Sequence, residues 1–187
     1  INGQRKRFIV QRINTNLFKN VDGLMNNIKL VTEFNRNEII KRGGDPDRES
    51  LTLVYTKNGA AYYRAEEGDC YRVYVFIEDA KGYDVVEKPE HFYQSAVAFG
   101  KFAQLLDRFD STQLFEVLPD FHNTVKRFDN LKKSLAADKF NRAADVKAEI
   151  DFALKHENIV GNIVNLLESG KMPSRVTHNE TKLNNVL

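Results

Sequence analysis

Four polar residues near the end of the sequence have the types and the spacing that acid–base chemistry uses: His178, Glu180, Lys182 and Asn185. A carboxylate and an amide five residues apart in one loop can converge on a single point. There the carboxylate accepts a proton from a hydroxyl and the amide oxygen holds a divalent cation, while His178 braces the loop. The alternative is a solvated turn whose polar side chains bond to the nearby backbone. The spacing alone leaves both interpretations open.

The composition predicts a soluble globular protein and excludes several classes. The 187 residues are 42% hydrophobic, which is enough for one good-sized domain or two small lobes. A formal net charge of +2 gives no charge excess of the kind that indicates a nucleic-acid partner. The apolar runs are too short to span a membrane. A single cysteine, Cys70, excludes a disulfide framework and a cysteine-based zinc site, and it fits a reducing compartment.

The first part of the sequence predicts strands around one helix. Residues 7–13 form an apolar, β-branched run that is typical of a strand. Helical spacing follows from Leu24 to Asn35, and the Gly and Pro residues within 42–46 predict the end of that helix. Lys-Asn-Gly at 57–59 is typical of a hairpin turn. An antiparallel meander is therefore predicted from three strands, at 50–56, 60–66 and 71–78.

The second part predicts helices. Apolar residues keep helical spacing in three stretches, 92–106, 125–135 and 146–167. Gly170 and Pro173 predict the end of the third helix. A short strand-like piece, Arg175–Thr177, leads into the polar loop, and Val186 with Leu187 would begin another strand.

These elements predict an α+β fold in two parts. Residues 1–85 would form a small antiparallel β lobe with one helix, and residues 86–187 a mostly helical lobe that ends in the polar loop. The opening stretch, INGQRKRFIVQRIN, reads as the second half of a hairpin whose first strand is absent.

Five stretches, in a fixed order, carry a resemblance to a known superfamily: FIVQRINTNLFKN, RGGDPDRESLTL, YRVYVFIEDAKGYD, LPDFHNTVKRF and RVTHNETKLNNVL. The sequence is similar to the aminoglycoside phosphotransferase and choline kinase superfamily, the small-molecule relatives of protein kinases. More narrowly it resembles the N-acetylhexosamine 1-kinase branch, over essentially all 187 residues. The resemblance implies a protein-kinase-like fold. It also implies that HNETKLNN is the catalytic loop, which in the family reads His-x-Asp with an Asn five residues after the Asp.

The resemblance implies an ATP-dependent kinase that phosphorylates the anomeric hydroxyl of N-acetylglucosamine or N-acetylgalactosamine, with Mg²⁺. Glu180 would accept the proton, His178 and Lys182 would assist in the same loop, and Asn185 would hold the metal. The implied partners are a sugar and a nucleotide, without nucleic acid or membrane, and the implied location is cytoplasmic. Because the family has Asp where Glu180 stands, a non-catalytic nucleotide- or sugar-binding protein remains the alternative.

Further residues take nucleotide-binding roles from the resemblance. Arg12 falls where the superfamily has the basic residue that meets the nucleotide phosphates, and Glu33 falls where kinases pair a Glu with that residue. Phe76, Ile77 and Glu78 fall at the hinge between lobes, whose backbone bonds adenine in this superfamily. The alternatives are an exposed strand Arg, a solvated helix Glu and apolar core residues.

The helical part would supply the sugar contacts, for which His122 and Arg127 are candidates. Relatives of this branch sometimes carry the label mucin-desulfating sulfatase. Sulfatases of the common type need a Cys or Ser followed by x-Pro-x-Arg, and no proline of this sequence stands in that pattern. The sulfatase interpretation therefore has no chemistry behind it.

Two parts of the family pattern have no counterpart in the sequence: the phosphate-covering loop and a second metal-binding Asp. The resemblance therefore implies an interior piece of a longer protein, truncated at both ends. On that interpretation the 187-residue chain alone is expected to show no kinase turnover.

Overall fold

The computed structural model describes residues 6–186 and confirms the α+β class, with one small antiparallel sheet and several helices. The chain divides into two compact units. Unit 1 comprises Ile1–Val117 together with Arg175–Leu187, and unit 2 comprises Leu118–Ser174. The predicted lobes, 1–85 and 86–187, have different bounds, because helix α3 belongs to unit 1.

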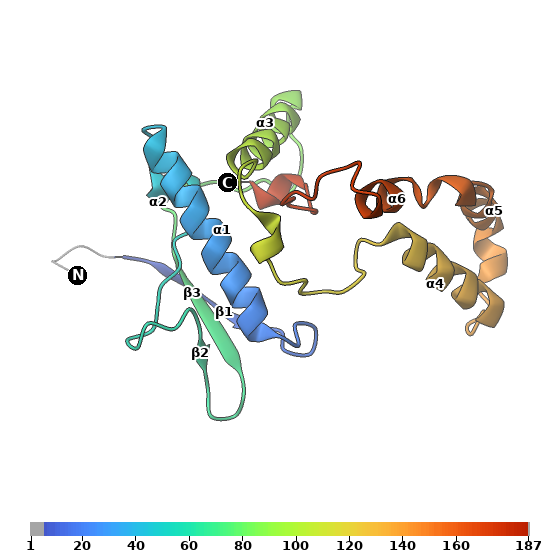
Figure 1. Cartoon of the computed structure of the whole chain (residues 1–187), viewed down its shortest axis with the longest axis horizontal. Helices are drawn as coiled ribbons and strands as arrows, with labels where there is room; N and C mark the ends of the chain where they lie inside the picture. Colours follow the sequence, from blue (N-terminus) through green and yellow to red (C-terminus); the bar gives the residue numbers. More distant parts are fainter. Residues whose placement is uncertain (1–5, 187) are drawn as a thin grey trace. The chain divides into compact units, whose positions relative to one another are not determined.

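Unit 1 contains the sheet, three helices and two 3₁₀ turns (Figure 1). In chain order its elements are β1 (Phe8–Ile13), α1 (Val21–Lys41), α2 (Pro46–Glu49), β2 (Tyr63–Arg64), β3 (Cys70–Val75), α3 (Pro89–Leu105), η1 (Ser111–Gln113) and η4 (Leu183–Asn185).

Strand β3 lies at the centre of the sheet, whose order is β1-β3-β2. Along one edge it pairs with the whole of β1, from Phe8 opposite Val75 to Ile13 opposite Cys70. Its other edge is shared, because β2 pairs only with the start of β3 and Leu53 forms an isolated bridge with Tyr74.

The predicted strands at 50–56 and 60–66 are therefore wrong in length, although the turn between them forms. The Thr56 N–H donates to the Ala60 carbonyl at 2.9 Å, and Gly59 has φ +81°, a left-handed conformation that glycine adopts without strain. Beyond this turn each arm bonds to a different part of β3, as in the Val54 N–H to Val73 carbonyl bond of 2.8 Å. Long-range pairing with β3 has replaced the local hairpin.

Helix α1 covers one face of the sheet (Figure 1). It begins where the Asn20 side chain accepts a hydrogen bond from the Gly23 N–H, and it ends before Gly43 and Gly44, as the sequence predicts. Val21 and Met25 pack into one buried cluster with residues from the strands and the bridge: Ile13, Leu53, Cys70 and Tyr74. The buried face of α1 continues through Asn35 and Ile39.

The segment after α3 is fastened to α1 by side chains. The Asn27 amide accepts a hydrogen bond from the Phe115 N–H at 2.8 Å and donates one to the Phe115 carbonyl at 2.7 Å. The rings of Phe34 and Phe109 meet edge to face with centroids 5.2 Å apart, and Leu106 is buried. These contacts place α3 and the following residues in unit 1.

Unit 2 is helical: α4 (Thr124–Ala137), η2 (Ala143–Val146), α5 (Lys147–Lys155), η3 (Glu157–Ile159) and α6 (Asn162–Glu168). The predicted single helix over 146–167 is wrong, because it breaks near His156. The His156 N–H bonds to Ala153, and its ring Nδ1 lies 2.7 Å from the Phe152 carbonyl that a continuing helix would use. The Thr124 hydroxyl of α4 bonds to the Val160 carbonyl beyond the break.

Candidate functional site

The loop at 178–185 brings three of its four predicted residues together. The Lys182 Nζ lies 3.0 Å from Glu180 Oε1, and the Asn185 amide nitrogen donates to the Glu180 backbone carbonyl at 2.8 Å. A carboxylate, a cation and an amide therefore occupy one short stretch, in which Asn185 is the last residue of η4. The Asn185 amide meets the Glu180 backbone and not its carboxylate, so the predicted convergence of carboxylate and amide oxygen on one point stays a prediction.

The loop backbone turns tightly just before Glu180. Asn179 has φ +60°, a left-handed conformation that Asn adopts more readily than most residues. The Glu180 N–H bonds to the His178 carbonyl at 2.8 Å, and the Lys182 N–H bonds to the Glu180 carbonyl at 3.1 Å. The predicted strand at Arg175–Thr177 is wrong, because these residues have no ladder partner in the described structure. The local bonds are also those of the polar-turn alternative.

Three residues in the loop or just before it make long-range contacts within unit 1. The His178 ring meets the rings of Phe99 and Phe102 on α3 edge to face, with centroids 5.1 and 5.6 Å apart. An Arg175 guanidinium nitrogen lies 2.8 Å from Asp107 Oδ1. The Asn184 amide donates to Asp84 Oδ1 at 3.2 Å. The ring contacts tie His178 to α3, and its predicted bracing role stays a prediction.

The ion pair of the loop faces solvent. The side chains of Glu180 and Lys182 are 68% and 54% exposed. Exposed pairs of this kind contribute roughly 0–1 kcal/mol, since water screens both charges. The pair therefore positions the Glu180 carboxylate but contributes little to the stability of the fold.

The structure does not pair Arg12 with Glu33. Arg12 on β1 is bound to Asp69 at 3.1 Å, and its side chain is 68% exposed. Glu33 on α1 accepts a hydrogen bond from the Tyr55 hydroxyl at 2.7 Å. Loss of solvent and this carboxylate raise the pKa of Tyr55 to about 12. The two predicted nucleotide-binding residues thus have separate partners, Asp69 and Tyr55, that their sequence patterns do not reveal.

The predicted hinge is occupied by arginine contacts that the sequence analysis missed. The Arg7 Nε lies 3.0 and 3.1 Å from the two carboxylate oxygens of Glu78, and the guanidinium carbon lies 4.0 Å from the Phe76 ring centroid. The Phe76 N–H bonds to the Arg7 carbonyl, and Arg48 donates to the Glu78 carbonyl. Two of the backbone groups in this segment therefore already have protein partners, while Phe76 and Ile77 are half-buried.

Arg7 lowers the pKa of Glu78 by hydrogen bonding to its carboxylate. We expect Arg7→Gln to raise that pKa toward its ordinary value, measured by an NMR titration of the glutamate side-chain carboxyl. Because the folded-state pKa is the lower one, the stabilisation by the pair is present above the unfolded-state pKa. It is lost as the pH falls through the folded value.

The control for this titration is Lys81→Gln, since the Lys81 ammonium lies over the Tyr83 ring instead. It should leave the Glu78 pKa unchanged. An equal Glu78 pKa in the starting protein and in Arg7→Gln would show that the ion pair does not form in solution.

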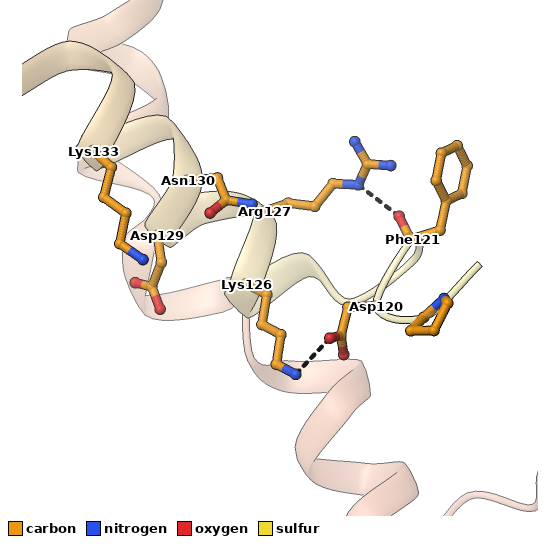
Figure 2. A pocket seen from close by; sticks show the side chains of 8 residues that line it. Asp120, Phe121, Lys126, Arg127, Asp129, Asn130 and Lys133 are labelled. Carbon is orange, nitrogen blue, oxygen red and sulfur yellow. Dashed lines mark hydrogen bonds and ion pairs between the residues drawn. The ribbon is translucent and has the colours of Figure 1, made fainter. Parts of the chain in front are cut away.

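The two predicted sugar contacts lie in unit 2, beside a cavity of about 610 Å³ (Figure 2). Arg127 lines the cavity, and its Nε donates to the Phe121 carbonyl at 2.6 Å. His122 does not line it, and its ring meets the Phe121 ring edge to face with centroids 4.9 Å apart. Besides Arg127 the lining residues are Pro119, Asp120, Phe121, Lys126, Asp129, Asn130 and Lys133.

The sequence analysis missed most of this cavity, although a signal was present. Positions 126, 129, 130 and 133 have the spacing of one helix face, and all four are polar. Because polar helix faces are common, this spacing alone does not indicate a cavity. The cavity exists because the 119–121 segment folds beside the polar face of α4.

The residues that the structure describes supply few ligands for a metal ion. Among residues 6–186 no group of three or more His, Cys, Asp or Glu side chains is arranged to hold one. Mg²⁺ takes oxygen ligands, usually one or two carboxylates with substrate phosphates. Asn185 offers its amide oxygen, but the Glu180 carboxylate is already paired with Lys182. The predicted metal role of Asn185 stays a prediction.

Two further findings concern membrane-spanning helices and known protein families. Within the described residues no helix combines the length and the apolar character that crossing a bilayer requires. A scan of the sequence against models of known protein families finds no match. The resemblance to the N-acetylhexosamine 1-kinases therefore stays a prediction.

Proposed function

We propose that this chain carries the catalytic loop of an ATP-dependent phosphotransferase of protein-kinase-like fold. Its acceptor would be the anomeric hydroxyl of N-acetylglucosamine or N-acetylgalactosamine. The observation that carries the proposal is the loop at 178–185, where Lys182 pairs with the Glu180 carboxylate and the Asn185 amide bonds to the Glu180 backbone carbonyl.

The proposed chemistry uses each of these groups for one task. The Glu180 carboxylate accepts the proton of the sugar hydroxyl while that oxygen attacks the γ-phosphorus of ATP. The bond between the γ-phosphorus and the bridging oxygen breaks, and ADP leaves. Lys182 places positive charge beside the carboxylate and the transferred group. Phosphoryl transfer needs positioning and charge more than covalent chemistry, so such a loop suffices on the acceptor side.

The nucleotide side of the proposal concerns Arg12, the Phe76–Glu78 segment and Asn185. Arg12 is an exposed cation on β1, suited to phosphate contact, although Asp69 competes for it. In the Phe76–Glu78 segment, one backbone N–H and one carbonyl are bound by Arg7 and Arg48. Mg²⁺ bound with ATP would offset phosphate charge, and Asn185 is the loop residue whose oxygen suits it.

A specific observation favours the second candidate, a kinase-like protein that binds nucleotide or sugar without catalysis. Glu180 stands where the family has Asp, and in this structure it is held by Lys182 in an exposed turn with local bonds. A binding protein of this kind would take up nucleotide in a calorimetric titration and release no ADP.

The proposal is tested by measuring ADP release by the full-length protein. We expect release that depends on N-acetylglucosamine or N-acetylgalactosamine. Glucose, galactose and choline serve as controls, and they should give little. No release with either N-acetylhexosamine would refute the kinase assignment, and nucleotide binding in the same sample would then support the second candidate.

A further inference from the structure

We infer that the cavity beside α4 in unit 2, called the α4 pocket below, binds a small phosphate-bearing anion. The pocket is formed by the 119–121 segment and the first three turns of α4 (Figure 2). Its volume, about 610 Å³, is that of a site for a small molecule. The inference does not depend on the phosphotransferase proposal.

The charges of the pocket leave two cations without a carboxylate partner. Lys126 is paired with Asp120 at 2.7 Å. Asp129 lies 3.3 Å from Lys132, which points to Glu157 as well. Within residues 6–186 no carboxylate forms an ion pair with either of the other two lining cations, Arg127 and Lys133.

Arg127 is held in a geometry suited to an anion. Its Nε bonds to the Phe121 carbonyl, and its guanidinium carbon lies 4.5 Å from the Phe121 ring centroid. Figure 2 shows the Nε bonded to that carbonyl and the two terminal nitrogens beyond it at the end of the side chain. An arginine whose Nε and flat face are fixed presents these nitrogens as a fork, which matches two phosphate oxygens.

The other donors continue along the helix. Arg127, Asn130 and Lys133 are spaced three residues apart, so they follow an inclined row that turns around α4 and rises about 9 Å at 1.5 Å per residue. The start of α4, capped by the Asn123 side chain, adds the positive end of the helix dipole. A phosphate monoester placed between Arg127 and Asn130 would have its phosphate at the guanidinium and its polar body along α4.

The acidic residues limit the size and charge of the ligand. Asp120 and Asp129 line the same cavity, and each lies beside a lysine. A long polyanion would meet these carboxylates, and the whole chain carries a net charge of only +2. A neutral sugar would leave the two unmatched cations without a counter-charge. A compact anion, such as phosphate or a phosphate monoester, would match the two unpaired cations and avoid the two carboxylates.

Isothermal titration calorimetry with three probes tests the inference: inorganic phosphate, N-acetylglucosamine 1-phosphate and neutral N-acetylglucosamine. We expect both phosphate compounds to bind, the monoester more tightly, and the affinity to fall as salt is raised. Arg127→Gln should weaken binding of the monoester by about tenfold to a hundredfold, because it removes a charge-assisted fork. Titrations contain no nucleotide, so a failed kinase assay would not bear on them.

Two further variants keep the test decisive if Arg127→Gln unfolds unit 2 by losing its bond to Phe121. Lys133→Gln changes an exposed side chain that forms no hydrogen bond or ion pair within residues 6–186, so folding should be unaffected and binding should weaken several-fold. Lys139→Gln is the matched control, since its ammonium lies by the Phe140 ring outside the pocket.

Equal binding to Lys133→Gln, Lys139→Gln and the unchanged protein would overturn the inference. It would also be overturned if neutral N-acetylglucosamine bound as tightly as its 1-phosphate and Arg127→Gln weakened both equally. That result would make the pocket a neutral-sugar site instead.

Discussion

Glu180→Gln is expected to lower kcat for sugar phosphorylation by about 10²- to 10⁴-fold, the usual contribution of a positioned general base. An amide has nearly the shape of the carboxylate but cannot accept the hydroxyl proton. Nucleotide affinity should change little, because Glu180 lies in the acceptor loop and not among the proposed ATP contacts. Steady-state kinetics with saturating N-acetylhexosamine and a nucleotide titration separate the two effects.

Glu180→Asp is the matched variant for this experiment. It keeps the charge opposite Lys182, shortens the side chain by one methylene and restores the residue that the resembling family has at this position. Activity should stay equal or rise. If Glu180→Gln instead kept full kcat, the catalytic assignment would have to be withdrawn, and the polar-turn and binding-protein alternatives would gain.

Ile39→Ala should lower the free energy of unfolding of unit 1 by about 2–5 kcal/mol, the range for deleting a buried aliphatic side chain. Ile39 is 0% exposed and lies on the face of α1 that is buried. Its methyl Cγ2 lies under Gly44, close enough that a Cβ there would approach it to 2.9 Å. Such tight surroundings leave a cavity when the side chain is removed. Urea unfolding followed by circular dichroism measures the change.

Ile40 supplies the control, since it is the next residue of the same helix and is 57% exposed. Ile40→Ala should change the free energy of unfolding by less than about 0.5 kcal/mol. Ala has a better helix propensity than Ile, which stabilises both variants by the same few tenths of a kcal/mol. The difference between their free energies of unfolding therefore reports burial alone. Equal urea midpoints for the two variants would contradict the burial of Ile39.

The sequence by itself determined the elements whose signals are local. Apolar spacing from Leu24 and the glycines after Arg42 indicated helix α1 and its end, because periodicity and stop signals act within a few residues, while its start at Asn20 came from the structure. The turn at 57–59 formed for the same reason. Lys182 and Asn185 also contact Glu180 through short-range geometry, Lys182 at its carboxylate and Asn185 at its backbone carbonyl, because the three residues are close in the sequence.

Partners that come from distant parts of the chain needed the tertiary structure. Arg12 pairs with Asp69, and Glu78 pairs with Arg7, 71 positions away. No spacing rule links such residues, because their approach depends on how β1 and β3 align. The α4 pocket likewise depends on the 119–121 segment returning to one face of α4.

The failed predictions have the same cause. The arms at 50–56 and 60–66 have the right residues for a hairpin, but β3 offers both of them backbone bonds over a buried cluster. The apolar period over 146–167 suits one helix, but the His156 ring and the α4 threonine take carbonyls at its break. Local propensity is worth tenths of a kcal/mol per residue, so a few long-range bonds and buried side chains decide between conformations that the sequence alone leaves close in energy.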